Sequence, residues 1–301
     1  MAQVHSNGIV IEYERFGPAD GEPILLIHGV GAQLLRWPQS FCNALATAGF
    51  HVIRFDNRDI GLSSHMDGLP VPDLAEIIAA KRRGETPALP YTLSDMAADT
   101  TGLMDALGIE AAHIVGVSLG GMIAQTLAIE APARVLSLAI LMSDSGNADL
   151  PPSNPAALSA LGTSAPDPRL DEEGYVRHSI ALNRAVGSPA YPTPDVELRR
   201  LALLAARRSY NPSGPARQFA AARGGPDRRQ ALGRLAIPTL VIHGADDPLL
   251  TVAGGEDVAR HVPNAWLLVL RGMGHDMPDA LTDIFVSAIG ANARRSGDAQ
   301  L

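Results

Sequence analysis

The chain has 301 residues, of which 46% are hydrophobic and 19% charged, and its formal net charge at pH 7 is −8. This length suits one large domain or two small ones, and the composition excludes an intrinsically disordered chain. The acidic balance argues against a protein built to cover a nucleic-acid backbone, so we expect no nucleic-acid partner.

The start of the chain and its apolar runs indicate a protein without a membrane partner. Residues 1–8 contain neither the basic nor the apolar stretch of a secretory signal. The densest apolar run, Val135–Met142, has eight residues, whereas a membrane-spanning helix needs about 18 or more. Cys42 is the only cysteine, which excludes an internal disulfide and fits a reducing compartment. We therefore expect a soluble, cytoplasmic protein.

Short apolar runs alternate with segments of helical pattern along most of the chain. An alternating run predicts an antiparallel edge strand at 10–15, and continuous apolar runs predict buried strands at 24–27, 52–55, 114–117, 135–142, 239–242 and 266–270. Helices are expected at 34–48, 93–107, 122–129, 255–261 and 280–291. This alternation predicts an α/β fold with a mostly parallel, doubly wound sheet.

Two stretches interrupt the alternation. Residues 61–91 contain one helical pattern at 74–83, and residues 147–234 contain helical patterns at 173–185, 196–210 and 216–223 without any strand pattern. The second stretch holds 11 of the 23 prolines and carries a charge of +4, whereas the remainder carries −12. We therefore expect a core domain made of residues 1–146 and 235–301, and an inserted helical cap domain at 147–234.

A serine lies between two glycines where an expected strand passes into an expected helix. The pentapeptide 116–120, Gly-Val-Ser-Leu-Gly, matches the pattern that places a nucleophile on a sharp strand-to-helix turn. Ser118 is therefore the candidate nucleophile. The following helix would point backbone N–H groups toward a developing oxyanion, and Leu119 would supply one of them. The alternative is a packing turn without chemistry.

A glycine-rich tetrapeptide, His28-Gly29-Val30-Gly31, ends an earlier strand. Glycines let a backbone approach a ligand closely, so Gly29 is a candidate substrate-binding residue and the N–H of Val30 a second oxyanion donor. His28 could be read as the general base, but a structural role is favoured because another histidine is better supplied with an acid.

A serine nucleophile needs a base, and the base needs an orienting acid. His275 follows the glycine-rich end of the strand at 266–270, and the pair Asp246-Asp247 follows the strand at 239–242. Pro248 restricts the residue before it to extended geometry, which favours Asp247 as the acid and leaves Asp246 to the turn or to solvent. Asp144, after the strand at 135–142, is a reserve candidate for which a turn role is favoured.

These motifs together resemble the α/β-hydrolase superfamily, over residues 10–289 except much of 147–234. The chain order Ser, Asp, His is the one in that family, and the resemblance implies that Asp247 is the acid and that Val30 and Leu119 are the oxyanion donors. Trp37-Pro38, the string 57–59 and the tetrapeptide 272–275 resemble, more narrowly, the branch of aclacinomycin methylesterase and related carboxylesterases. In the motif that contains the string 57–59, the common family form has glycine where this sequence has Asp59, and this difference marks a subfamily.

The resemblance implies hydrolysis of a small-molecule carboxylic ester through an acyl-enzyme and without a cofactor. Methyl esters are among the substrates that it implies. A cofactor-free perhydrolase and a carbon–carbon hydrolase use the same triad and stay open as alternatives. A ligand receptor that keeps the fold without catalysis is a further alternative. The sequence leaves the oligomeric state open between monomer and homodimer.

Other side chains allow weaker hypotheses. Met142 and Met273 border strand ends and are candidate pocket residues, with core packing as the alternative. The nine histidines form no metal-ligand spacing, so no metal is expected. The arginine pairs at 199–200 and 207–208 favour a solvated face of one cap helix, with attraction of an anionic substrate as the alternative.

Overall fold

The structure is a computed structural model that describes residues 1–298, so the last three residues of the predicted core segment 235–301 lie outside it. Eight strands of the described chain form one sheet in the order β1-β2-β4-β3-β5-β6-β7-β8. The strands are β1 (Ala2–Ser6), β2 (Ile9–Phe16), β3 (Glu22–Ile27), β4 (Phe50–Phe55), β5 (Ala112–Val117), β6 (Val135–Leu141), β7 (Thr239–Gly244) and β8 (Trp266–Leu270). β3 to β8 are parallel. The α/β fold with a mostly parallel sheet is thus confirmed.

The strand predicted at 10–15 is present and antiparallel, as β2, but its predicted place at the edge of the sheet was wrong. β2 pairs antiparallel with β4 on one side and with β1 on the other, in a register that sets Val4 opposite Ile11. The short and largely polar β1 therefore forms the edge. Its sequence, Ala-Gln-Val-His-Ser, carries too little apolar alternation to predict a strand.

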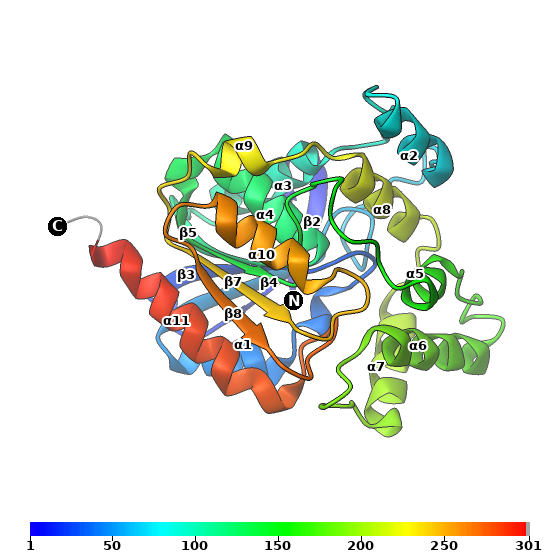
Figure 1. The fold of residues 1–301 in the computed structure, drawn as a ribbon. Helices are drawn as coiled ribbons and strands as arrows, with labels where there is room; N and C mark the ends of the chain where they lie inside the picture. The colour runs from blue at the N-terminus through cyan, green and yellow to red at the C-terminus, as the bar shows by residue number, and fades with distance from the viewer. Residues whose placement is uncertain (299–301) are drawn as a thin grey trace.

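Helices cover both faces of the sheet (Figure 1). α1 (Gln39–Thr47) and α11 (Thr282–Asp298) pack on one face, and α3 (Leu93–Ala106), α4 (Leu119–Glu130) and α10 (Val252–His261) pack on the other. Each face buries its own apolar cluster. The single helix predicted at 34–48 is instead a 3-10 turn, η1 (Leu34–Arg36), followed by α1. Pro38 separates them because it lacks an N–H and disfavours helical geometry at Trp37.

No strand lies between β6 and β7 in the described chain, and the residues between them form five helices. α6 (Glu172–Val186), α7 (Asp195–Arg208) and α8 (Gly214–Gly224) lie near their predicted positions. α5 (Pro155–Gly162) and α9 (Arg229–Leu232) were not predicted. We call residues 147–234 the helical segment. α5, α6 and α7 lie together beyond one end of the sheet, and α8 lies next to α2 (Leu74–Arg82) (Figure 1).

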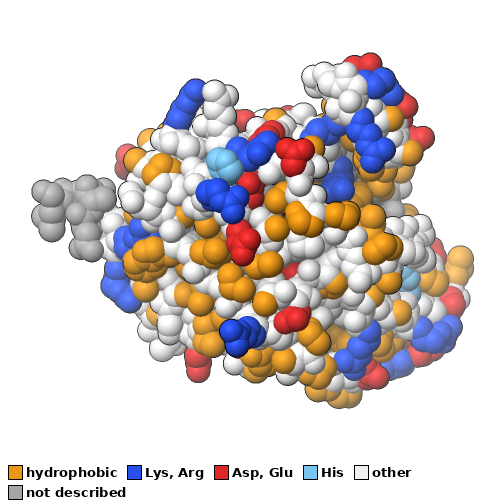
Figure 2. Space-filling view, viewed as in Figure 1, with side chains coloured by type: hydrophobic (Ala, Val, Ile, Leu, Met, Phe, Trp, Pro, Cys, Tyr) orange, Lys and Arg blue, Asp and Glu red, His pale blue; other side chains and the backbone are white. Residues whose placement is uncertain are grey.

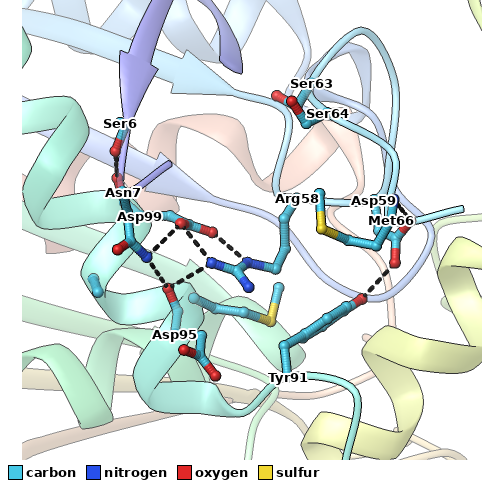
Figure 3. A network of polar contacts seen from close by, with 12 residues as sticks. Ser6, Asn7, Arg58, Asp59, Ser63, Ser64, Met66, Tyr91, Asp95 and Asp99 are labelled. Carbon is cyan, nitrogen blue, oxygen red and sulfur yellow. Dashed lines mark hydrogen bonds and ion pairs between the residues drawn. The ribbon is translucent and has the colours of Figure 1, made fainter. Parts of the chain in front are cut away.

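The loop after β4 is held by a network of buried charges (Figure 3). Arg58 donates from Nε and Nη2 to the carboxylate of Asp99 on α3, at 2.6 and 2.7 Å. Tyr91 donates its hydroxyl to Asp59, whose carboxylate also accepts the N–H of Met66. The loop therefore has a fixed shape before any contact with the helical segment is considered.

No helix in residues 1–298 is both long and apolar enough to cross a membrane. On the face shown in Figure 2, basic and acidic side chains are interspersed, and neither sign forms a continuous patch.

Candidate active site

Ser118 lies at a sharp turn between β5 and α4. Its φ is 56° and its ψ is −119°. Residues other than glycine rarely adopt a positive φ of this kind. The two flanking glycines make this turn possible. A Cβ on Gly116 would lie 2.2 Å from the carbonyl oxygen of Gly120, and a Cβ on Gly120 would lie 2.0 Å from that of Ile27. The turn therefore lifts a serine side chain out of the strand end.

The backbone N–H groups of Val30 and Leu119 form no hydrogen bond to a protein acceptor in the described chain, and both residues line the cavity near this serine. Beyond Ser118, the N–H groups of Gly121 and Met122 donate to its carbonyl, whereas that of Leu119 has no such bond. In the loop after β3, Gly29 and Gly31 donate to side chains, and Val30 does not. A Cβ on Gly29 would lie 3.1 Å from the Cβ of Ser118, so this glycine brings the loop against the serine.

His275 and Asp247 are in direct contact. The Nδ1 atom of His275 lies 2.7 Å from Oδ2 of Asp247, and the carboxylate is completely buried. The other oxygen, Oδ1, accepts the N–H groups of Leu249 and Leu250 at 2.8 and 2.9 Å. These bonds to the turn fix the carboxylate so that Oδ2 points at the imidazole.

A second histidine, His243, lies beneath the same carboxylate. Its Nε2 atom lies 3.4 Å from Oδ2 of Asp247 and 2.7 Å from the carbonyl oxygen of Leu250, and its side chain is completely buried. Burial alone would raise the pKa of the Asp247 carboxyl, but His275 and His243 outweigh burial and hold that pKa well below its usual range. Asp247 is therefore an anion at any pH near neutrality.

The other acidic candidates have turn roles. Asp246 is exposed and accepts the N–H of Gly272. Asp144 accepts the N–H of Gly146 two residues later. His28 accepts the N–H of Gly29 and packs edge-on against the Trp37 ring. Burial, then the charges of Arg36 and His275, lower the pKa of His28 to about 3, so its imidazole is neutral and a poor base.

Ser118 and His275 both line one large cavity of about 930 Å³. Gly29, Val30 and Leu119 line it as well, whereas Met142 and Met273 do not. Both methionines are completely buried in the apolar cluster beneath α1 and α11. Their predicted place in the pocket was therefore wrong, because a strand end that points toward the cavity also has a face that packs on helices.

The opposite wall of the cavity belongs to the helical segment. Its side chains are mostly apolar and include Leu158, Leu161, Leu182, Leu201 and Phe219. The loop with His275 touches this segment directly, since its N–H groups at Gly274 and His275 donate to the Ser188 hydroxyl and the Val186 carbonyl. The cavity therefore lies between the sheet edge and the helical segment.

The predicted solvated face of arginines on one helix is only partly present. Arg199, Arg200 and Arg207 are exposed and pair with glutamates. Arg208 instead is buried, and its Nη1 donates to the buried carboxylate of Asp56 at 2.7 Å. Arg208 is the last residue of α7, and its partner Asp56 lies 152 residues earlier in the chain, so no local pattern marked this arginine as buried.

Sequence reasoning missed three polar residues of the site. His243 beneath Asp247 is one, and Arg36 and Asp276 in the cavity wall are the others. His243 lies four residues before Asp247, and Asp276 directly follows His275, so nearness along the chain could have suggested both. Arg36 has no such signal, because only the fold brings it to the site.

Known proteins similar to this chain agree with the fold. Residues 22–279 match the family model described as the alpha/beta hydrolase fold. The chain is 31% identical over 294 residues, 92% of each chain, to the rhodomycin D methylesterase DauP of Streptomyces sp. strain C5. It is 28% identical over 260 residues, 85% of this chain and 82% of the relative, to a 2-hydroxy-6-oxononadienedioate/2-hydroxy-6-oxononatrienedioate hydrolase of Paraburkholderia phymatum. Its fold resembles that of the meta-cleavage product hydrolase CumD from Pseudomonas fluorescens IP01, with a TM-score of 0.78, 20% identity and 98% of each chain covered.

Proposed function

We propose that this chain, which belongs to the α/β-hydrolase family of enzymes, hydrolyses a carboxylic ester with Ser118 as nucleophile, His275 as general base and Asp247 as orienting acid. The observation that carries the proposal is the 2.7 Å contact between His275 and a buried, ionised Asp247, at a cavity that Ser118 also lines. The 31% identity to a named methylesterase over nearly the whole chain favours an ester as the substrate.

The geometry supports a two-step acyl transfer. Ser118 attacks the ester carbonyl while His275 takes its proton, and the N–H groups of Val30 and Leu119 bind the oxyanion. His275 then protonates the leaving alcohol, and water activated by the same ring releases the acid. Asp247 holds the imidazole in the tautomer that presents Nε2 to the serine and stabilises its charged form.

We also propose that the helical segment, residues 147–234, is a cap that shapes the substrate pocket over a core made of residues 1–146 and 235–301. Its leucines and Phe219 give the cavity a mostly apolar wall. A cavity of about 930 Å³ lies at the upper end of the range for small-molecule sites. The cap therefore favours a bulky apolar part in the ester.

A direct test is turnover of methyl hexanoate, followed by release of methanol, in the wild type and in Ser118→Ala. We expect hydrolysis by the wild type and a loss of at least about 1000-fold in the variant, with circular dichroism unchanged. A variant as active as the wild type would contradict the proposal. Absence of turnover in both proteins, both with a range of methyl esters and with the dienedioate assayed below, would favour a ligand receptor.

Carbon–carbon bond hydrolysis is a second candidate, favoured by the 28% identity to the hydrolase of Paraburkholderia phymatum. The same serine, histidine and aspartate serve both reactions, so only the substrate separates them. The dienedioate in that relative's name is therefore assayed beside methyl hexanoate. Turnover of the dienedioate alone, lost in Ser118→Ala, would favour the second candidate.

A further inference from the structure

One cation in the wall of the active-site cavity has no anionic partner. Arg36 ends the 3-10 turn η1 and lines the cavity together with Ser118 and His275. Its Nη2 atom donates to Oδ1 of Asn183 at 3.2 Å. Arg36 takes part in none of the ion pairs of residues 1–298, and the charge of Asp276 acts on it without such a contact. A half-buried guanidinium without a carboxylate is unusual, because buried charges are normally paired.

Three other arginines near the site have acidic partners. Arg200 also lines the cavity, but its guanidinium is bound by Glu197 of the same helix. Arg54 lines the cavity as well and is paired with Glu14. Arg208 is paired with Asp56. Arg223, at the last turn of α8, also lines the cavity without an ion pair in the described chain, but no hydrogen bond holds it and its guanidinium lies over the Phe219 ring at 5.8 Å. Arg36 differs from all of these arginines because a neutral amide holds its guanidinium in place.

Hydrogen bonds of the residues before and after Arg36, and one of its own side chain, hold this arginine in place. The N–H of Leu34 donates to Asp56, and the carbonyl of Trp37 accepts from Arg54, so the backbone around Arg36 is fixed. Asn183 donates its own amide to the carbonyl of Ser179, which turns its oxygen toward Arg36. A neutral amide thus positions the guanidinium without neutralising it. Such preorganisation is what a ligand-binding arginine requires.

The other guanidinium nitrogens of Arg36, Nε and Nη1, form no hydrogen bond in the described chain, and neither is completely buried. Because Arg36 lines the cavity, a ligand bound there can reach its guanidinium. Arg36 is also near the reacting groups. Its charge contributes to the lowered pKa of His28 beside the oxyanion loop and favours the ionised form of Asp276, the residue after His275.

Asp276 does not satisfy Arg36. Its carboxylate is bound by the hydroxyl of Ser188, and burial raises its pKa. Asp276 and Asp279 both line the cavity, and they would repel a dianion such as a phosphate monoester. A single carboxylate matches the planar fork of an arginine and adds only one negative charge.

We propose that Arg36 binds a carboxylate of the substrate, so that the preferred esters carry one free carboxylate besides the ester that Ser118 attacks. This inference depends on the proposed esterase function, and it adds the class of substrate: half-esters of dicarboxylic acids or larger esters with one acidic group. The carboxylate lies at the wall formed by η1 and α6, and the apolar remainder of the substrate contacts the leucines of the helical segment.

The test compares matched pairs of methyl esters. Monomethyl glutarate, adipate, pimelate and suberate are each paired with the methyl ester of the monocarboxylic acid of equal length, such as methyl hexanoate for adipate. We expect the wild type to have the higher kcat/KM for the half-ester in at least one pair. Arg36→Met should lower kcat/KM for that half-ester by about 10- to 100-fold and change that for the neutral ester by less than about threefold.

Three further variants show whether the effect belongs to this side chain. Arg36→Lys should retain part of the preference, because it keeps the charge without the planar fork. Arg199→Met removes an exposed charge outside the cavity and should leave the preference intact. Arg223→Met removes a second arginine of the cavity wall, at the last turn of α8. Thermal midpoints of all variants are recorded beside the kinetics.

Several outcomes would overturn the inference. One is a wild type that prefers the neutral ester in every pair. Another is an Arg36→Met enzyme that loses both esters equally, which a purely structural role for the contact with Asn183 would produce. A third is loss of the preference in Arg223→Met but not in Arg36→Met. Since Ser118→Ala on methyl hexanoate tests the esterase function separately, failure here leaves that function standing.

Discussion

The edge of the sheet that carries Ser118, Asp247 and His275 and the helical segment above it are stabilised in different ways. At the sheet edge, short-range backbone contacts set each side chain, as in the turn bonds that fix Asp247 and the glycines that flank Ser118. The helical segment buries mostly small apolar residues of its own: Ala157, Val176, Leu198, Ala202, Ala220 and Ala221. Besides apolar contacts, arginines with buried side chains join it to the core.

These arginines contact acidic or polar groups at the ends of core strands. Arg208 of α7 binds Asp56, Arg217 of α8 binds Asp59, and Arg228 binds the carbonyl of Asp144 and the side chain of Gln125. Arg217 donates to both oxygens of Asp59, at 2.6 and 2.8 Å, and its side chain is 1% exposed. The proposed catalytic side chains and the helical segment are therefore held in place by different forces. Substitutions at the two regions should therefore have different consequences.

Asp247→Asn should have the largest effect, and it should fall on activity. An asparagine favours the wrong tautomer of His275 and cannot stabilise its charged form, so kcat should fall by about 1000-fold or more. Ester turnover under saturating substrate measures this. Asp246→Asn is the matched control, since Asp246 is exposed and bonds only the loop at Gly272. A loss of similar size in Asp246→Asn would mean that Asp247 is not the acid of the triad.

Arg217→Met should instead act on stability. It leaves Asp59 as a buried charge without its main partner, which typically costs about 3–5 kcal/mol of unfolding free energy. Urea unfolding at pH 7 measures the difference. Arg199→Met is the control: it breaks an exposed pair with Glu173 and should leave the unfolding midpoint unchanged. Equal effects of the two substitutions would mean that the buried contact does not anchor the helical segment.

His28 should make stability depend on pH at the sheet edge. Its pKa is about 3 in the folded protein and about 6.5 in an unfolded chain. Between these values the unfolded chain binds a proton that the folded protein does not, so stability falls as pH falls, by up to about 1.4 kcal/mol per pH unit. His28→Asn should reduce that slope between pH 6.5 and 4. Parallel unfolding curves for the two proteins would contradict the assignment.

His243→Asn should have the smallest effect, because this ring positions Asp247 without touching substrate. We expect kcat to fall about tenfold, a loss typical of residues that orient a site from behind, with KM unchanged. A loss as large as that of Asp247→Asn would mean that His243 takes part more directly. An unaffected enzyme would show that the turn bonds to Leu249 and Leu250 are sufficient.

The sequence predicted the sheet edge better than the helical segment for a physical reason. Ser118, Asp247 and His275 each lie in the turn or loop beyond the carboxyl end of a strand, and parallel strands bring their carboxyl ends to one edge. The positions of the parallel strands and of the longer helices were predicted because their apolar patterns are local features of the sequence. The edge strand β1 was missed because it has no apolar pattern of its own. It is a strand because it pairs with β2.

Arg36, Arg208 and Asp59 could not have been interpreted from local pattern. Asp59 has a φ of 71°, in a region that glycine enters easily, which accounts for glycine as the common family form at this position. Here its side chain binds Arg217, about 160 residues later in the sequence. Contacts over such separations leave no periodicity, so burial of these charges is visible only in the fold.

The central claim is that Ser118 is the nucleophile. Diethyl p-nitrophenyl phosphate transfers a diethylphosphoryl group to an activated serine and releases p-nitrophenol, and peptide mass spectrometry locates the group. We expect one adduct per chain, on Ser118, with ester turnover falling in proportion to the fraction of Ser118 that is labelled. An adduct on a different residue with turnover lost, or full turnover after Ser118 is completely labelled, would contradict the claim.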